Sequence, residues 1–106
     1  MRTYYKSAGY LAADTIAAQG GTLALITGFN PTANAGFLLL FESETVPVNG
    51  DAPIEAISVP ANANFSLSPV PPGRPFAHLH FAVSSTGDTL TASADAYSVS
   101  ATVDAG

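Results

Sequence analysis

Two histidines stand two positions apart in the segment FAHLHFAVSS, and the chain has no others. Residues two apart on a strand point to the same side, so His78 and His80 place two imidazoles where both can bind one metal ion. A metal site needs further ligands, which Glu42, Glu44 or Glu55 would have to supply after folding. Because no spacing fixes a third ligand, we expect no metal and no other cofactor. The two imidazoles then lie on the less buried face of a sheet or in a subunit contact.

The rest of the sequence lacks the motifs of common catalytic and nucleotide sites. A Ser-His-Asp arrangement would have to use the same two histidines, and no G-x-S-x-G elbow is present. The turn 49–51 (NGD) is not a D-x-[DN]-x-[DN]-G calcium loop, and GGTLALITG lacks the G-x-G-x-x-G order. With no cysteine, thiol chemistry and disulfides are excluded. We expect no enzyme activity; a small cupin-like metalloenzyme using His78 and His80 is an alternative.

The segment 76–85, which carries both histidines, has apolar residues at every second position. This period is typical of a strand with one buried face, so the segment is the expected central strand. Its expected partner is 36–41 (GFLLLF), which shows no alternation. That run is predicted to be buried on both faces or covered on its outer face by another chain.

Turn residues divide the remaining chain into further short segments with the alternation of strands. We expect these strands at 2–6, 15–18, 22–29, 54–59, 64–68 and 96–103. Gly20-Gly21 predicts a hairpin between the second and third of them, although the alanines of 7–19 would also suit a helix. The four prolines of 69–75 predict an extended, non-pairing connection.

About seven or eight short strands, roughly ten residues apart, are typical of an antiparallel β-sandwich. We expect one domain over residues 1–106, with 1–12 as an N-terminal arm. An immunoglobulin-like sandwich of the antibody type would bring a tryptophan and paired cysteines, and the chain has neither. A jelly-roll-like, all-β fold is therefore predicted.

The surface must be short of charge, because only 10% of the residues are charged and 47% are apolar. An average soluble domain has about 25% charged residues. We therefore expect part of the surface to be covered by copies of the chain or by a larger assembly. Three Lys and Arg residues and a net charge of -5 argue against nucleic acid and anionic membranes as partners. No signal peptide or membrane-spanning run is expected.

The residues expected to make such contacts are aromatic, apolar, basic or imidazole side chains near the N-terminus and on the two central strands. They are Tyr4, Tyr5, Tyr10, Phe37, Leu39, Arg74, Phe76, His78 and His80.

Three patterns in the region 15–103 together resemble a known group of proteins. They are TIAAQGGTLALITGFNPTANAGFLLLFES, a P-x-N-G-D loop, and FAHLHFAVSSTGDTLTASADAYSVSATV. They resemble the small β-sandwich proteins encoded among the structural genes of tailed bacteriophages, where the position of His78 is usually glycine. The resemblance implies a non-enzymatic virion component without catalytic residues.

Within that group, a capsid decoration or cement protein is the expected role. Such a protein would form a homotrimer, contact the major capsid protein and lie on the capsid surface of the virion after assembly in the host cytoplasm. The alternative is a fibre or neck-associated module that binds a carbohydrate or receptor through exposed tyrosines and the polar loops around Asn49 and 62–64.

Overall fold

The computed structural model describes residues 2–7, 9–17, 20–43, 45–68, 74–93 and 95–105. This part of the chain forms nine β-strands and no helix, and none of its segments is a helix able to cross a membrane. The strands are β1 (Arg2–Lys6), β2 (Ala13–Ala17), β3 (Gly21–Asn30), β4 (Gly36–Phe41), β5 (Glu55–Val59), β6 (Ala63–Leu67), β7 (Arg74–Phe76), β8 (Leu79–Ser84) and β9 (Ser98–Ala105).

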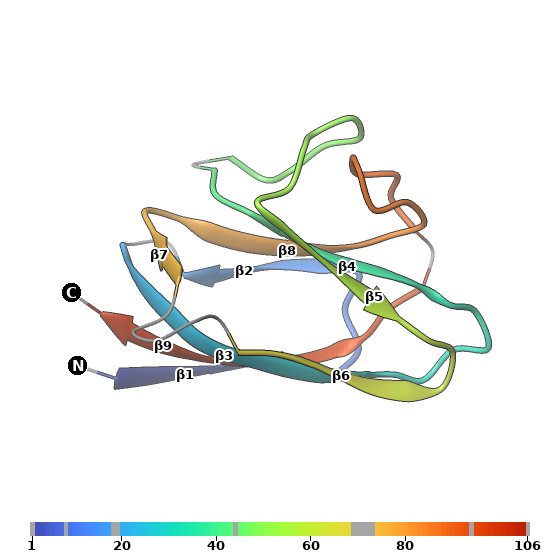
Figure 1. The fold of residues 1–106 in the computed structure, drawn as a ribbon, viewed down its shortest axis with the longest axis horizontal. Coiled ribbons are helices and arrows are strands. Elements are labelled where there is room, and N and C mark those ends of the chain that lie inside the picture. The colour runs from blue at the N-terminus through green and yellow to red at the C-terminus, as the bar shows by residue number, and fades with distance from the viewer. Residues whose placement is uncertain are drawn as a thin grey trace.

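The strands form two antiparallel sheets packed face to face (Figure 1). The large sheet has the order β1-β9-β3-β6, with β7 also paired to β3, and the small sheet has the order β2-β8-β4-β5. The pairs β1/β9, β2/β8, β3/β6 and β4/β5 nest from the ends of the chain toward its middle, as in a long hairpin wound into two sheets. This is the winding of a jelly roll, so the predicted fold class is confirmed.

Two local predictions between the strands are wrong. β2 pairs with β8 in the small sheet and β3, which begins at Gly21, pairs with β9 in the large sheet. The chain therefore passes from one sheet to the other before Gly21, and β2 and β3 do not form a hairpin. The helix alternative for the same region fails because β2 is a strand. Most of the proline-rich connection lies outside the described residues, but its end, β7, pairs with β3 and is therefore not a non-pairing segment.

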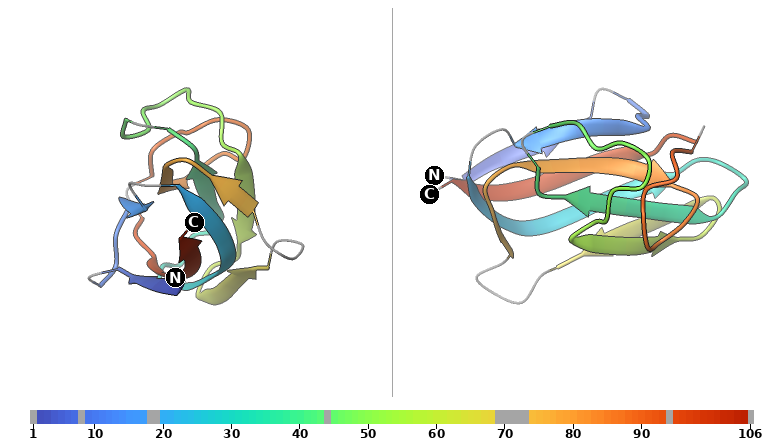
Figure 2. Two further views of the ribbon diagram at one scale, coloured as in Figure 1. Left: turned by 90° about the vertical axis from the view of Figure 1, so that its left-hand side faces the viewer. Right: turned by 90° about the horizontal axis from the view of Figure 1, so that it is seen from above.

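The core lies between the two sheets, as the alternation in the sequence predicts. The inner residues of β8 are Leu79, Phe81 and Val83, each at most 1% exposed. In β9 and the residue before it, every second side chain is again buried in this core: Tyr97, Val99, Ala101 and Val103. Figure 2 shows the two layers of strands from two further directions.

The run GFLLLF in β4 is buried on both faces within a single chain. Leu38 and Leu40 belong to the core, while Leu39 and Phe41 form a second apolar cluster with Ala82 and Leu90. Two loops on the outer side of the small sheet supply the cover: the valine loop, residues 45–53, and the loop 85–92 (Figure 1). Of the two predicted explanations for this run, burial by the chain itself is therefore confirmed.

Backbone and side-chain hydrogen bonds hold these two loops together. The amide of Gly50 donates to the carbonyl of Leu90 (2.8 Å), and the amide of Leu90 donates to the carbonyl of Asp51 (2.8 Å). The side-chain Oδ1 of Asn49 accepts from the amide of Ala92 at 2.8 Å. The valine loop is thereby fixed over the sheet at three points.

Tyr97 is fully buried, and its hydroxyl makes no hydrogen bond within the described part of the chain. Its ring packs against Phe65 with a centroid distance of 5.9 Å. Burial, followed by the negative charge of Asp95, raises the pKa of Tyr97 above its ordinary value. An unpaired hydroxyl in such a site is a cost to folding.

The Tyr97→Phe variant is expected to be more stable than the wild type by about 1 kcal/mol, because it removes the unpaired hydroxyl and keeps the ring. Urea unfolding followed by circular dichroism measures the difference. Tyr5→Phe is the matched control: the Tyr5 hydroxyl donates to the Asp14 carboxylate, so its loss should destabilise. A Tyr97→Phe variant that is less stable than the wild type would contradict this account.

Candidate functional site

The two histidines do not lie side by side on one strand. β8 begins at Leu79, so His78 occupies the bend between β7 and β8, and only His80 is in the strand. The prediction of a continuous strand 76–85 is therefore wrong at its start. Within the described ranges, no group of three or more histidine, cysteine, aspartate or glutamate residues gathers as metal ligands would.

His80 lies on the outer face of the small sheet and is only 6% exposed. Its Nδ1 is 2.9 Å from the hydroxyl oxygen of Thr15 on β2, the strand next to β8. Both residues line a cavity of about 200 Å³, with Val46 and Pro47 of the valine loop among its other walls. The contact joins β2 to β8, and Asp14 of β2 lines the same cavity.

The nine predicted contact residues fall into different environments. Tyr4 and Tyr10 are largely exposed, at 77% and 57%. Leu39, Phe76 and His80 are covered by the chain itself, so a partner cannot reach them in this conformation. The half-buried ones are Tyr5, Phe37 and His78, and Arg74 lies at the start of β7, opposite Leu23 of β3.

Tyr5 joins the open edges of the two sheets. It packs against Phe81 in an edge-to-face arrangement, with the ring centroids 6.1 Å apart, and its hydroxyl donates to the Asp14 carboxylate on β2. Burial and then the hydrogen bond to this carboxylate raise the pKa of Tyr5. Its role is thus in the core, not on an exposed surface.

Two valines that the sequence analysis did not single out are the exposed large aliphatic side chains of the described part. Val46 is 66% exposed and Val48 is 64% exposed, and Pro47 stands between them in the valine loop. The V-P-V pattern in an otherwise polar loop was the available signal. Because the loop is fixed at three points, the two valines form a preformed apolar projection outside the small sheet.

The opposite side of the molecule, the outer face of the large sheet, is rich in hydroxyl groups. The register places Lys6, Ser100, Thr27 and Ser66 in one row across β1, β9, β3 and β6. In the next row, Phe29 lies between Ser98 and Asn64. These residues come from four separate strands, so no local motif in the sequence indicates them.

Fold and surfaces together define a small jelly-roll β-sandwich protein with two unlike outer faces, one apolar at the valine loop and one rich in hydroxyl groups. Comparisons with protein-family models, with curated proteins and with solved structures gave no match for this chain. The similarity to phage structural proteins remains a hypothesis from the sequence patterns.

Proposed function

We propose that this protein is a non-enzymatic virion structural protein, a decoration or cement protein that stabilises the head of a tailed bacteriophage. It acts as a homotrimer on the capsid surface and contacts the major capsid protein. The resemblance of the region 15–103 to small structural proteins of tailed bacteriophages supports the virion setting. The observation that carries the contact function is the preformed apolar projection of the valine loop.

The projection is suited to binding because its shape is set before a partner arrives. The amide of Val48 donates to the Asp51 carboxylate at 2.9 Å, in addition to the bonds that join the loop to 85–92. Ordering a flexible loop opposes association, and this loop is already ordered. Burying the two valines against a neighbour therefore contributes directly to affinity.

The low charge of the chain supports the same function. Because only 10% of the residues are charged, few charged side chains lose their hydration when a partner covers one face of the molecule. Burial of apolar surface contributes about 25 cal/mol per Å², so one small contact is weak. In a trimer, each copy makes the same small contact. Once the first contact has formed, the other two form within the same complex, so the trimer binds more tightly than a single copy.

The Val46→Asp/Val48→Asp variant is expected to fold normally. Its affinity for phage particles should fall at least about tenfold, because two charges replace the apolar contact. Particles from cells that express the gene are purified on a density gradient, and the copies of the protein per particle are counted by quantitative mass spectrometry. Ala33→Asp/Ala35→Asp adds the same charge on another exposed loop and should leave the count unchanged.

Two results would overturn the proposal. One is a wild-type protein that does not co-sediment with particles, and the other is a valine-loop variant that is retained as well as the wild type. Sedimentation equilibrium at micromolar concentration tests the trimer separately. A monomer in that experiment removes the homotrimer from the proposal.

A further inference from the structure

We infer that the outer face of the large sheet binds a neutral carbohydrate, in a groove that crosses its strands. This goes beyond the proposed function, because the groove lies on the opposite side of the molecule from the valine loop. It consists of two hollows, of about 460 Å³ and 340 Å³. Both are lined by Ser98, so they adjoin at the start of β9 and form one surface, the hydroxyl groove.

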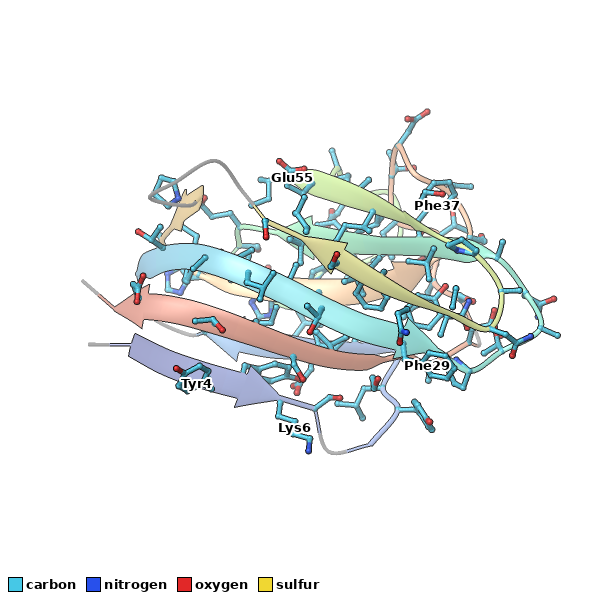
Figure 3. All side chains as sticks on the ribbon, turned by 60° about the horizontal axis from the view of Figure 1, so that its bottom comes forward. Tyr4, Lys6, Phe29, Phe37 and Glu55 are labelled. Atoms are coloured by element: carbon cyan, nitrogen blue, oxygen red, sulfur yellow. The ribbon has the colours of Figure 1, made fainter. Side chains whose placement is uncertain are left out.

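The register of the sheet determines which side chains point into the groove. Phe65 and Val99 are buried in the core, so their neighbours along the strands, Asn64 and Ser98, point outward. Phe29 lies directly opposite both and therefore points outward as well. Figure 3 shows Phe29 at the end of β3, with Tyr4 well away from it on β1.

The lining combines aromatic rings with uncharged hydrogen-bonding groups. Phe29 lines the first hollow and Tyr10, 57% exposed, lines the second. The polar side chains of the two hollows are Lys6, Ser7, Thr27, Asn64, Ser66, Ser98 and Ser100. Carboxylates are missing from this set, and Lys6 is its one cation.

Five of these side chains have hydrogen-bonding groups that are unoccupied in the described part of the structure. No hydrogen bond joins the side chains of Thr27, Asn64, Ser66, Ser98 or Ser100 to another described residue. Polar side chains elsewhere, such as Ser84, are by contrast occupied in holding loops. The groove thus presents unused donors and acceptors.

A pyranose ring matches this surface because it has an apolar C–H face and a rim of hydroxyl groups. The C–H face packs on an aromatic ring, and the hydroxyls pair with serine, threonine and asparagine side chains. Neighbouring strands lie about 4.8 Å apart, so hydroxyls in one row can contact successive parts of one sugar chain. A polyanion would need several cations, and a protein interface would favour a larger apolar area.

The test is affinity electrophoresis of the purified full chain in gels that contain dextran, glucomannan or a mixed-linkage β-glucan, with heparin as the polyanionic comparison. We expect retardation by at least one neutral polysaccharide. Phe29→Ala and Tyr10→Ala should each weaken it about tenfold, the loss expected when a stacked ring is removed. Tyr4→Ala, which removes an exposed ring outside the groove, should leave it unchanged.

Thermal unfolding first establishes that each variant is folded, and Ser66→Ala, a smaller change on the exposed face, gives a second reading if Phe29→Ala is unstable. Retardation by none of the neutral polysaccharides, or by heparin alone, would overturn the inference. So would equal retardation of Phe29→Ala and the wild type, or a dimer of the chain that Phe29→Ala dissociates. The gels contain no phage particles, so the outcome of this experiment does not depend on the count of protein copies per particle.

Discussion

The Gly28→Ala variant is expected to lose about 3 kcal/mol or more of unfolding free energy, the upper end of the cost of overpacking a core. A Cβ at this position would lie within 3 Å of the carbonyl oxygen of Ser98 and of two ring carbons of Phe65. Gly28 lies within β3, between β9 and β6, so the backbone cannot move aside without breaking a ladder on one side.

Urea unfolding monitored by circular dichroism measures this loss against Gly9→Ala. Gly9 has φ of +88° and open space around it, so alanine there costs only backbone strain, about 1 kcal/mol. Combining Gly28→Ala with Phe65→Leu removes the ring clash but not the carbonyl clash, and should restore part of the stability lost. Equal losses for Gly28→Ala and Gly9→Ala would show that the close packing is not as described.

The parts of the fold that could be predicted are those that local periodicity determines. In β8 the alternation of Leu79, Phe81 and Val83 follows the pleat, and all three lie in the core. The same period predicted the buried side of β9. Strand count and turn spacing then indicated the sandwich.

The connections could not be predicted in the same way, because a turn signal does not say which strands pair. Gly20-Gly21 has the composition of a hairpin, yet the following strand, β3, pairs with β9 at the far end of the chain. The cover of β4 also depends on distant residues, since Asn49 and Leu90 meet only after folding. Sequence patterns predicted that β4 is covered but not by what.

Tyr10 and Asn64 were among the residues expected to bind, but the other residues of the proposed binding surfaces were missed for a related reason. Phe29 looked like the end of a strand, and Ser66 and Ser98 looked like ordinary strand residues on a solvent face. Their significance comes from the register that places them side by side. Val46 and Val48 were missed because a turn-rich loop is expected to be polar, and their exposure becomes clear only when the loop is seen fixed to 85–92.

Asn30 is another residue whose importance only the structure reveals. The pair Asn30-Pro31 predicted a turn, but the side chain is fully buried and all its hydrogen-bonding capacity is used. Its Nδ2 donates to the carbonyls of Asn34 (2.9 Å) and Pro60 (3.0 Å). Its Oδ1 accepts from the amide (2.8 Å) and the hydroxyl (2.7 Å) of Thr32. One amide group thus joins the loop after β3 to the turn between β5 and β6.

The Asn30→Asp variant is expected to lose about 3 kcal/mol or more at pH 7, because a buried carboxylate would face two carbonyl oxygens. Burial raises the pKa of the new carboxyl in the folded state above its unfolded value of about 3.9. The folded state then binds the proton more tightly, so the part of the destabilisation that comes from ionisation is absent below the unfolded pKa and grows as pH rises through the folded pKa. A protonated carboxyl has one donor hydrogen where the amide has two, so the loss of one hydrogen bond to Asn34 or Pro60 remains at every pH.

Chemical unfolding at a series of pH values between 3 and 8, with the wild type measured in parallel, tests this sign. Asn64→Asp places the same carboxyl on an exposed strand position and should change stability by less than about 0.5 kcal/mol. Asn30→Ala loses the hydrogen bonds without adding an ionisable group, so its deficit should not vary with pH. If the Asn30→Asp deficit is equally flat, the side chain is not enclosed as described. Because Asn30 follows Phe29 and pairs with Ala63, the end of the large sheet that forms the hydroxyl groove would then also be less firmly positioned.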